Sequence, residues 1–188
     1  PDAMSRGSRP GVGASFWVYF KNSLIVAFFT IVGTLVSNTP VAYAFARLKF
    51  PGRDILFVIS LATMMLPSVI TMVPNYVIMA RLGWVDTFLP LIIPAVFGGG
   101  AFYIFVLRQF FAGIPRELDE AARLDGAGHL RTLWTIMIPL SLPVLVTFGL
   151  LATQDVWNDF LWPLIITNTE NMRTLPIGIS RMLDQEGN

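Results

Sequence analysis

Hydrophobic residues in this chain form long uninterrupted runs, and the charged residues gather in the short segments between them. Four intervals of at least about 20 residues, enough for a helix to cross a bilayer, hold no charged side chain: Lys21 to Arg47, Asp54 to Arg81, Asp86 to Arg108 and Arg131 to Asp155. The runs are continuous rather than alternating in polarity, which argues against strands. The pattern therefore predicts four membrane-spanning helices, near residues 22–46, 55–80, 87–108 and 137–166.

The composition of the chain also indicates a membrane protein. Of its 188 residues, 54% are hydrophobic and only 13% are charged, and the mean hydropathy is +0.64. A soluble domain carries about 25% charged residues, and a soluble core of this size could not bury so many apolar side chains. We expect an all-α membrane protein, a polytopic helical bundle with four spans in this chain.

Few residues are available for catalysis or for binding a metal ion. The chain contains 0 cysteines and one histidine, His129, so no catalytic residue and no metal site is expected. The net charge of +1 does not indicate binding to nucleic acid. No GxxxxGK[ST] phosphate-binding loop occurs, so we expect no cofactor on this chain and no ATP hydrolysis by it.

The basic residues between the spans predict the orientation of the chain. The second loop holds only Arg81, whereas the first and third loops hold Arg47, Lys49, Arg53, Arg108, Arg116, Arg123 and Arg131. Because loops rich in lysine and arginine stay in the cytoplasm, the first and third loops are expected to be cytoplasmic. Both ends then lie outside, including residues 1–15 as an outer-side N-terminal segment. This is unusual for a complete inner-membrane protein, so a fragment lacking one span at each end is expected.

The third loop contains the signals of a short helix. Pro115 is suited to its first turn, and Glu117, Asp119 and Glu120 follow where acids favour the positive end of the helix dipole. Gly126 and Gly128 can end it, so a helix is predicted near residues 116–126. Its i, i+3, i+4 spacing places four residues on one face, where small alanines allow close approach of another surface: Leu118, Ala121, Ala122 and Asp125.

The same loop carries a spaced motif. Three residues separate Glu120-Ala121-Ala122 from Gly126, and nine more separate Gly126 from Ile136. One further residue lies between Ile136 and the pair Ile138-Pro139. This arrangement resembles the E-A-A-x3-G-x9-I-x-L-P signature loop of ABC-importer permeases, with Ile138 where leucine is usual. The segments AYAFARLKFPGR at 42–53 and WNDFLWPL at 157–164 are similar to the second permease of maltose-type sugar importers.

The resemblance implies a function, a site and partners. It implies that residues 16–188 belong to a six-span transmembrane domain of an importer that moves a sugar or related polyol across the bacterial inner membrane. The region near 116–128 would be the coupling helix, with ATPase-coupling residues Glu120, Ala121, Ala122, Asp125, Gly126, Ile136 and Pro139. The implied partners are an ATP-binding subunit dimer, a second permease subunit, an extracytoplasmic solute-binding protein and the lipid bilayer.

Polar residues also interrupt the fourth predicted span. Gln154, Asp155, Asn158 and Asp159 follow the spacing i, i+1, i+4, i+5, which places them in one stripe. Ionisable groups at membrane depth usually face a bundle interior or a watery cavity, and hydroxyl-rich sugars need such donors and acceptors. The stripe is therefore a candidate solute path. Hydrogen bonding between helices, or a wet outer end of the span, remains the alternative.

Two other functions compete with the importer. An ion- or proton-coupled secondary transporter working without an ATPase would use Asp155 and Asp159 as a proton relay. Such a transporter has no reason to shape a cytoplasmic docking helix. A membrane-embedded enzyme would need ionisable residues from several spans, whereas the charges within spans sit on one span here.

Overall fold

The computed structural model describes residues 12–98 and 100–186, and the described part of the chain folds into helices joined by short loops. The outer-side segment expected at 1–15 lies outside the described residues except for 12–15, which begin α1. In chain order the elements are α1 Val12–Arg47, α2 Arg53–Thr63, α3 Ser68–Arg81, α4 Leu89–Gly98, α5 Ala101–Gly113, α6 Glu117–Leu124, α7 His129–Thr132, the π-helical η1 Leu133–Met137, α8 Ile138–Leu140, α9 Leu142–Asn158, α10 Leu161–Ile166, the 3-10 helix η2 Glu170–Met172 and α11 Leu175–Glu186.

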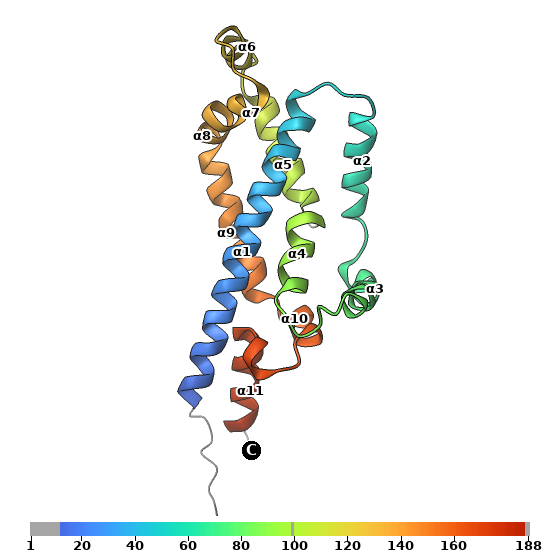
Figure 1. Cartoon of the computed structure of the whole chain (residues 1–188), viewed down its shortest axis with the longest axis vertical. Helices are drawn as coiled ribbons and strands as arrows, with labels where there is room; N and C mark the ends of the chain where they lie inside the picture. The colour runs from blue at the N-terminus through green and yellow to red at the C-terminus, as the bar shows by residue number, and fades with distance from the viewer. Residues whose placement is uncertain (1–11, 99, 187–188) are drawn as a thin grey trace, which may run out of the picture.

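The long helix α1 is the element against which the others pack. It contacts α4, α5, α9 and α11, and it runs through almost the full height of the molecule (Figure 1). Pro40 lies inside it without ending it, as membrane helices tolerate. Polar side chains of α1 hold the end of the chain: the Asn22 amide donates to the carbonyl oxygens of Asn171 and Arg173, at 2.7 and 2.9 Å.

Two of the predicted spans are confirmed as helices long and apolar enough to cross a bilayer, Phe16–Arg47 and Leu89–Gly113. The other two are bent pairs within the described residues. The pair α2 and α3 turns by 97° after Thr63, and the pair His129–Leu140 and Leu142–Asn158 turns by 78°. Counting each bent pair as one span gives the predicted four. The spans predicted near 55–80 and 137–166 correspond to these two bent pairs, the second of which begins at His129 and ends at Asn158. Hydropathy reports the length of an apolar run and not its direction, so it did not give the bends.

Two hydrophobic cores hold the bundle together. One lies towards the α6 end and joins α1, α5, η1 and α9 through Tyr43, Leu107, Phe111, Met137 and Phe148. The other joins α1, α3, α4 and α10 through Val26, Met79, Leu91 and Ile166. Many remaining apolar side chains on the spans are exposed, which suits a surface that faces lipid or another subunit.

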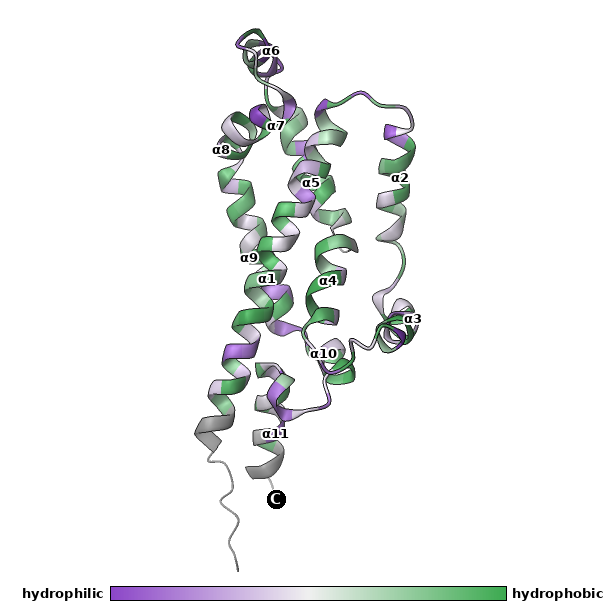
Figure 2. Cartoon of the chain, in the orientation of Figure 1, coloured by the Kyte–Doolittle hydropathy of each residue, from purple (hydrophilic) through white to green (hydrophobic). Residues whose placement is uncertain are grey.

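The loops separate to opposite ends of the bundle. The segment between α1 and α2 lies at the same end as α6, whereas α10, α11 and the start of α1 lie at the other end (Figure 1). Colouring by hydropathy shows a largely hydrophilic α6 above apolar segments of α4 and α9 (Figure 2). The first and third loops therefore lie at the same end of the bundle, as two loops on one side of a membrane would.

Asp86 closes the loop at the end opposite α6. Its φ of 63° lies in the left-handed region, and its Oδ1 accepts hydrogen bonds from the backbone amides of Asn168 and Thr169 at 2.8 and 2.9 Å. The amide of Thr169 first, and that of Asn168 with it, hold the pKa of this carboxyl below its ordinary value. The α3–α4 loop is thereby fixed to the segment after α10.

Candidate functional site

The short helix predicted in the third loop is present as α6. It begins at Glu117 and ends at Leu124, with Pro115 and Arg116 before it and three acids in its first turn. It projects beyond the rest of the bundle at one end of the molecule (Figure 1). A polar helix that projects from the bundle is accessible to another protein.

Gly126 ends α6 in the manner expected. Its φ of +76° is in the left-handed region that favours glycine. The Gly126 amide donates to the Arg123 carbonyl at 3.0 Å and the Ala127 amide to the Ala122 carbonyl at 2.8 Å. These two bonds form a Schellman motif, which satisfies carbonyl groups at the helix end and turns the chain sharply.

The two faces of α6 differ from the predicted arrangement in one position. Ala122 is only 6% exposed and faces the protein, so it offers no surface to a partner. The reason is that the i, i+3 pair of Asp119 and Ala122 packs inward. The exposed residues, here called the α6 face, are Glu117, Leu118, Glu120, Ala121, Arg123, Leu124 and Asp125.

An ion pair holds α6 to α1. Arg47 Nη1 lies 3.3 Å from Asp119 Oδ2, and the two side chains are 4% and 13% exposed. Arg47 Nη2 also donates to the carbonyl oxygen of Ile114, just before α6. The sequence pattern indicated only that Arg47 orients the chain, whereas the structure shows that it positions α6.

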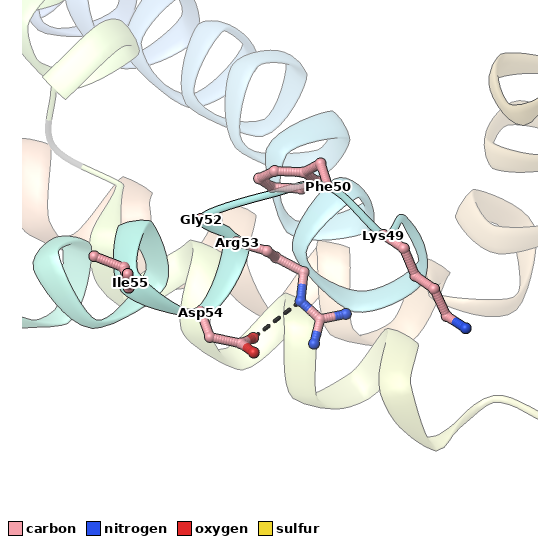
Figure 3. Close-up of a pocket in the computed structure, with 6 residues that line it drawn as sticks. All are labelled: Lys49, Phe50, Gly52, Arg53, Asp54 and Ile55. Carbon is pink, nitrogen blue, oxygen red and sulfur yellow. Dashed lines mark hydrogen bonds and ion pairs between the residues drawn. The ribbon is translucent and has the colours of Figure 1, made fainter.

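The first loop, at the same end, carries further charge. Gly52, with φ of +79°, turns the chain into α2, and Arg53 and Asp54 point toward each other with Nε and Oδ1 2.9 Å apart (Figure 3). These residues line an open hollow of about 420 Å³ together with Lys49 and Phe50 (Figure 3). The hollow is shallow and its charges are already paired or solvated, so it is not a candidate ligand site.

The remaining motif residues connect α6 to the fourth span. Ile136 lies half-buried in the π-helical segment η1, and Pro139 lies exposed in α8. Leu133 and Met137 anchor this segment in the core beside α1 and α5. Beyond the break at Ser141 the chain turns by 78° into α9. A displacement of α6 would therefore reach α9 through a packed, bent segment.

The four residues of the predicted stripe lie together beside a cavity. Gln154, Asp155 and Asn158 come from α9, and Asp159 follows it as the C-cap residue. All four line a cavity of about 840 Å³ between α1, α3, α4, α9 and α10, here called the polar cavity. Asp155 accepts a hydrogen bond at 3.2 Å from the Tyr103 hydroxyl.

The polar cavity has a second wall that the sequence pattern did not single out. It contains four small polar residues from α1 and α3: Thr30, Ser68, Thr71 and Asn75. The last three follow the spacing i, i+3, i+7 in α3, which places them on one helix face. That spacing within an apolar run was the signal available in the sequence.

A family comparison covers both of these regions. Residues 38–186 match the family described as binding-protein-dependent transport system inner membrane component. The matched region begins inside α1 and extends to the end of α11. It therefore includes α6, its motif and the α9 wall of the polar cavity.

Relatives in sequence and in structure extend over almost all of the chain. It is 36% identical over 173 residues to the arabinooligosaccharides transport system permease protein AraQ of Halalkalibacterium halodurans, covering 92% of this chain and 61% of that protein. It is 36% identical over 180 residues to the sn-glycerol-3-phosphate transport system permease protein UgpE of Yersinia enterocolitica, covering 94% and 63%. The crystal structure of a bacterial ABC transporter involved in the import of the acidic polysaccharide alginate matches with a TM-score of 0.83 at 30% identity, covering 93% of this chain and 62% of that chain. The chain thus spans about three fifths of the length of these proteins.

Proposed function

Because the chain belongs to the family of inner membrane components of binding-protein-dependent transport systems, we propose that it forms much of the permease subunit of an ATP-binding-cassette importer, with α6 as the coupling helix. The observation that carries the proposal is the placement of the Glu120-Ala121-Ala122 and Gly126 motif on a short polar helix. That helix projects from the bundle at the end where the basic loops gather.

The geometry of α6 supports a role in passing force from a motor to the spans. The ion pair from Arg47 to Asp119 fixes α6 to the central helix, and η1 and α8 connect it to α9. An ATP-binding partner that closes while holding the α6 face would displace these elements as a unit. Such closure favours one arrangement of the spans over another because the partner contacts the two arrangements differently.

The partners follow from the same role. Two ATP-binding subunits would bind the nucleotide and its magnesium, since this sequence carries no phosphate-binding loop. A second permease subunit would complete the solute path, and an extracytoplasmic solute-binding protein would deliver the solute at the end opposite α6. The chain would lie in the bacterial inner membrane as a multi-pass protein.

The solute is a sugar or a related polyol compound. The relatives are named for arabinooligosaccharides and sn-glycerol 3-phosphate, and the related structure for the polysaccharide alginate. Hydroxyl groups are common to these solutes. The donors and acceptors of four residues that line the polar cavity suit such hydroxyl groups: Gln154, Asp155, Asn158 and Asp159.

A test of the proposal is co-purification with the ATP-binding subunit of the same transporter. Glu120 is exposed on the α6 face, and Glu120→Lys reverses its charge without opening a core. We expect this variant to lose most of the bound ATP-binding subunit. Asp54→Lys makes the same charge change at the same end of the molecule but outside α6, and it should retain the partner. Equal recovery in both variants would count against the assignment of α6.

A further inference from the structure

The size and the lining residues of the polar cavity bear on which solutes it can accept. Its volume of about 840 Å³ is in the range of binding sites for small organic molecules. The polar side chains come from three of its walls, α1, α3 and α9 with its C-cap: Thr30, Ser68, Thr71, Asn75, Gln154, Asp155, Asn158 and Asp159. These walls line an open space with hydroxyl, amide and carboxylate groups.

The charges of the cavity are all of one sign. Asp155 and Asp159 are its ionisable residues, and no lysine, arginine or histidine of the described residues lines it. Neither aspartate belongs to an ion pair within residues 12–98 and 100–186. The recorded partner of Asp155 is neutral: the Tyr103 hydroxyl donates to it at 3.2 Å. The negative charge in the cavity is therefore not neutralised by neighbouring cations.

A second feature of the cavity is a buried hydroxyl group on its α1 wall. Thr30 lines the cavity and is only 4% exposed, yet its hydroxyl oxygen has no hydrogen-bond partner among the described residues. A buried hydroxyl without a partner is unfavourable unless a water molecule or a ligand supplies one. The amides of Asn75 and Gln154 add groups that can both donate and accept.

One wall also offers an aromatic ring in a fixed orientation. Trp162 lines the cavity, and its indole Nε1 donates to the carbonyl oxygen of Pro90 at 3.1 Å. This bond ties α10 to α4 and holds the ring in place. A flat aromatic surface beside hydroxyl-binding groups suits the apolar face of a sugar ring.

We propose that the polar cavity is a charge-selective part of the solute path, which accepts neutral hydroxyl-rich solutes such as unmodified oligosaccharides and disfavours anionic ones such as sugar phosphates and uronates. This inference rests on the proposed function, because it assumes that solute passes this wall. Two uncompensated carboxylates in a cleft with low-dielectric walls concentrate cations and repel anions. Among the described residues that line this cavity, a phosphate or uronate group would meet no arginine or lysine to offset that repulsion.

The absence of cysteine from this chain allows a direct test. Asn158→Cys places one thiol in the cavity between the two aspartates. The variant is assembled with its partner subunits in membrane vesicles and treated with a cationic or an anionic methanethiosulfonate of similar size. The chain without the introduced cysteine serves as the blank for background labelling. The labelling rate of the cationic reagent is divided by that of the anionic reagent, and this ratio is then corrected by the same ratio measured with a simple thiol in solution.

We expect the cationic reagent to label the cysteine about tenfold faster than the anionic one, or more, after this correction. A factor of ten is the low end of the range by which a charged cleft raises the local concentration of an oppositely charged molecule. Replacing both aspartates, Asp155→Asn with Asp159→Asn, should abolish that preference. Asp155→Glu, which keeps the charge, should retain it. Asn75→Cys on the opposite wall gives a second position with the same expected preference, in case Asn158→Cys disturbs folding.

Three results would overturn the inference: equal corrected rates, a preference for the anionic reagent, or no reaction at either position. Labelling does not require ATP or transport, so this outcome is separate from that of the proposed function. If Glu120→Lys abolishes partner binding while the cation preference is absent, the importer assignment stands and the charge selectivity fails. If the preference is present but the partner never binds α6, the cavity favours cations but the importer assignment fails, and with it the placement of the cavity on a solute path.

Discussion

Arg47, the last residue of α1, lies 3.3 Å from Asp119 of α6, and both side chains are largely buried. One ion pair therefore joins the helix that projects from the bundle to the helix at its centre. A buried pair of this kind adds little stability over an apolar pair, but removing one partner leaves a charge without compensation. The pair fixes where α6 stands.

The first prediction concerns that pair. Asp119→Leu leaves the Arg47 guanidinium buried without its carboxylate and should lower the free energy of unfolding by about 3–5 kcal/mol. Arg47→Met should have a similar cost, because Asp119 then loses its counter-charge. The double variant should be more stable than either single variant. Denaturant unfolding of the assembled transporter gives the comparison, and additive losses in the double variant would show that the two residues are not coupled.

Gly126 provides a second prediction, with Gly128 as its matched control. Gly126→Ala forces a side chain into φ of +76°, at a cost of roughly 1–2 kcal/mol, and strains the Schellman turn that ends α6. Gly128 has φ of −74°, which alanine adopts without strain. ATP hydrolysis stimulated by the solute-loaded binding protein should fall by up to about tenfold in the first variant and little in the second. Equal activity in the two variants would mean that this turn does not matter for coupling.

The hydrogen bonds that Asp86 accepts from the backbone amides of Asn168 and Thr169 give a third prediction. Asp86→Asn keeps an acceptor oxygen and tolerates φ of 63°, whereas Asp86→Val loses the acceptor and places a β-branched residue in that strained conformation. The valine variant should expose the segment near Thr169 to proteolysis from the outer side, and the asparagine variant should resemble wild type. Similar cleavage of all three proteins would contradict this role of Asp86.

The same hydrogen bonds to Asp86 predict how stability depends on pH. Because the folded-state pKa of Asp86 is depressed, its carboxylate contributes stability fully above the unfolded-state pKa of about 3.9 and loses it as the pH falls through the lower folded pKa. Asp86→Asn has no such titration. The difference in melting temperature between wild type and this variant should therefore be constant from pH 7 down to mild acid and change only below about pH 4. A change centred near neutral pH would point to another group.

Packing between α1 and α11 supplies a further prediction. A Cβ atom added at Gly178 would strike the ring of Tyr19, whose hydroxyl donates to Glu170 at 2.7 Å. Gly178→Ala should cost about 1–3 kcal/mol through overpacking, more than alanine gains in helix propensity. Gly149→Ala in α9 is the control, since its nearest neighbour would be Ile31 Cγ2 at 4.0 Å. Thermal unfolding should separate the two, and a stabilised Gly178→Ala protein would contradict the close contact.

Much of this structure was predictable from local signals. Pro115, the acids after it and Gly126 define α6 to within about two residues, because helix starts and stops depend on nearby groups. Basic residues placed the first and third loops on one side, and the structure has them at one end. The stripe of Gln154, Asp155, Asn158 and Asp159 was correctly placed on one surface because helical spacing determines it.

Features that depend on distant parts of the chain were not predictable. The bend of 97° between α2 and α3 falls at residues 64–67, where the apolar run continues. Pro67, the N-cap of α3, is a local sign of a break in the helix, but neither it nor the hydropathy gives the angle. Arg47 looked like any other loop arginine, because its burial requires α6 to fold back against the end of α1. The α3 wall of the polar cavity likewise becomes part of a site only when α3 crosses towards α9 and α10.

Photo-crosslinking from α6 in living cells distinguishes a coupling helix from an ordinary loop helix. Leu124 is 89% exposed on the α6 face, and Leu183 in α11 is 64% exposed at the opposite end of the molecule. A photoreactive phenylalanine analogue at position 124 should crosslink to the ATP-binding subunit, and the same analogue at position 183 should not. Absence of that crosslink from position 124, or its appearance from position 183, would contradict the assignment of α6 as the helix that the ATP-binding subunit holds.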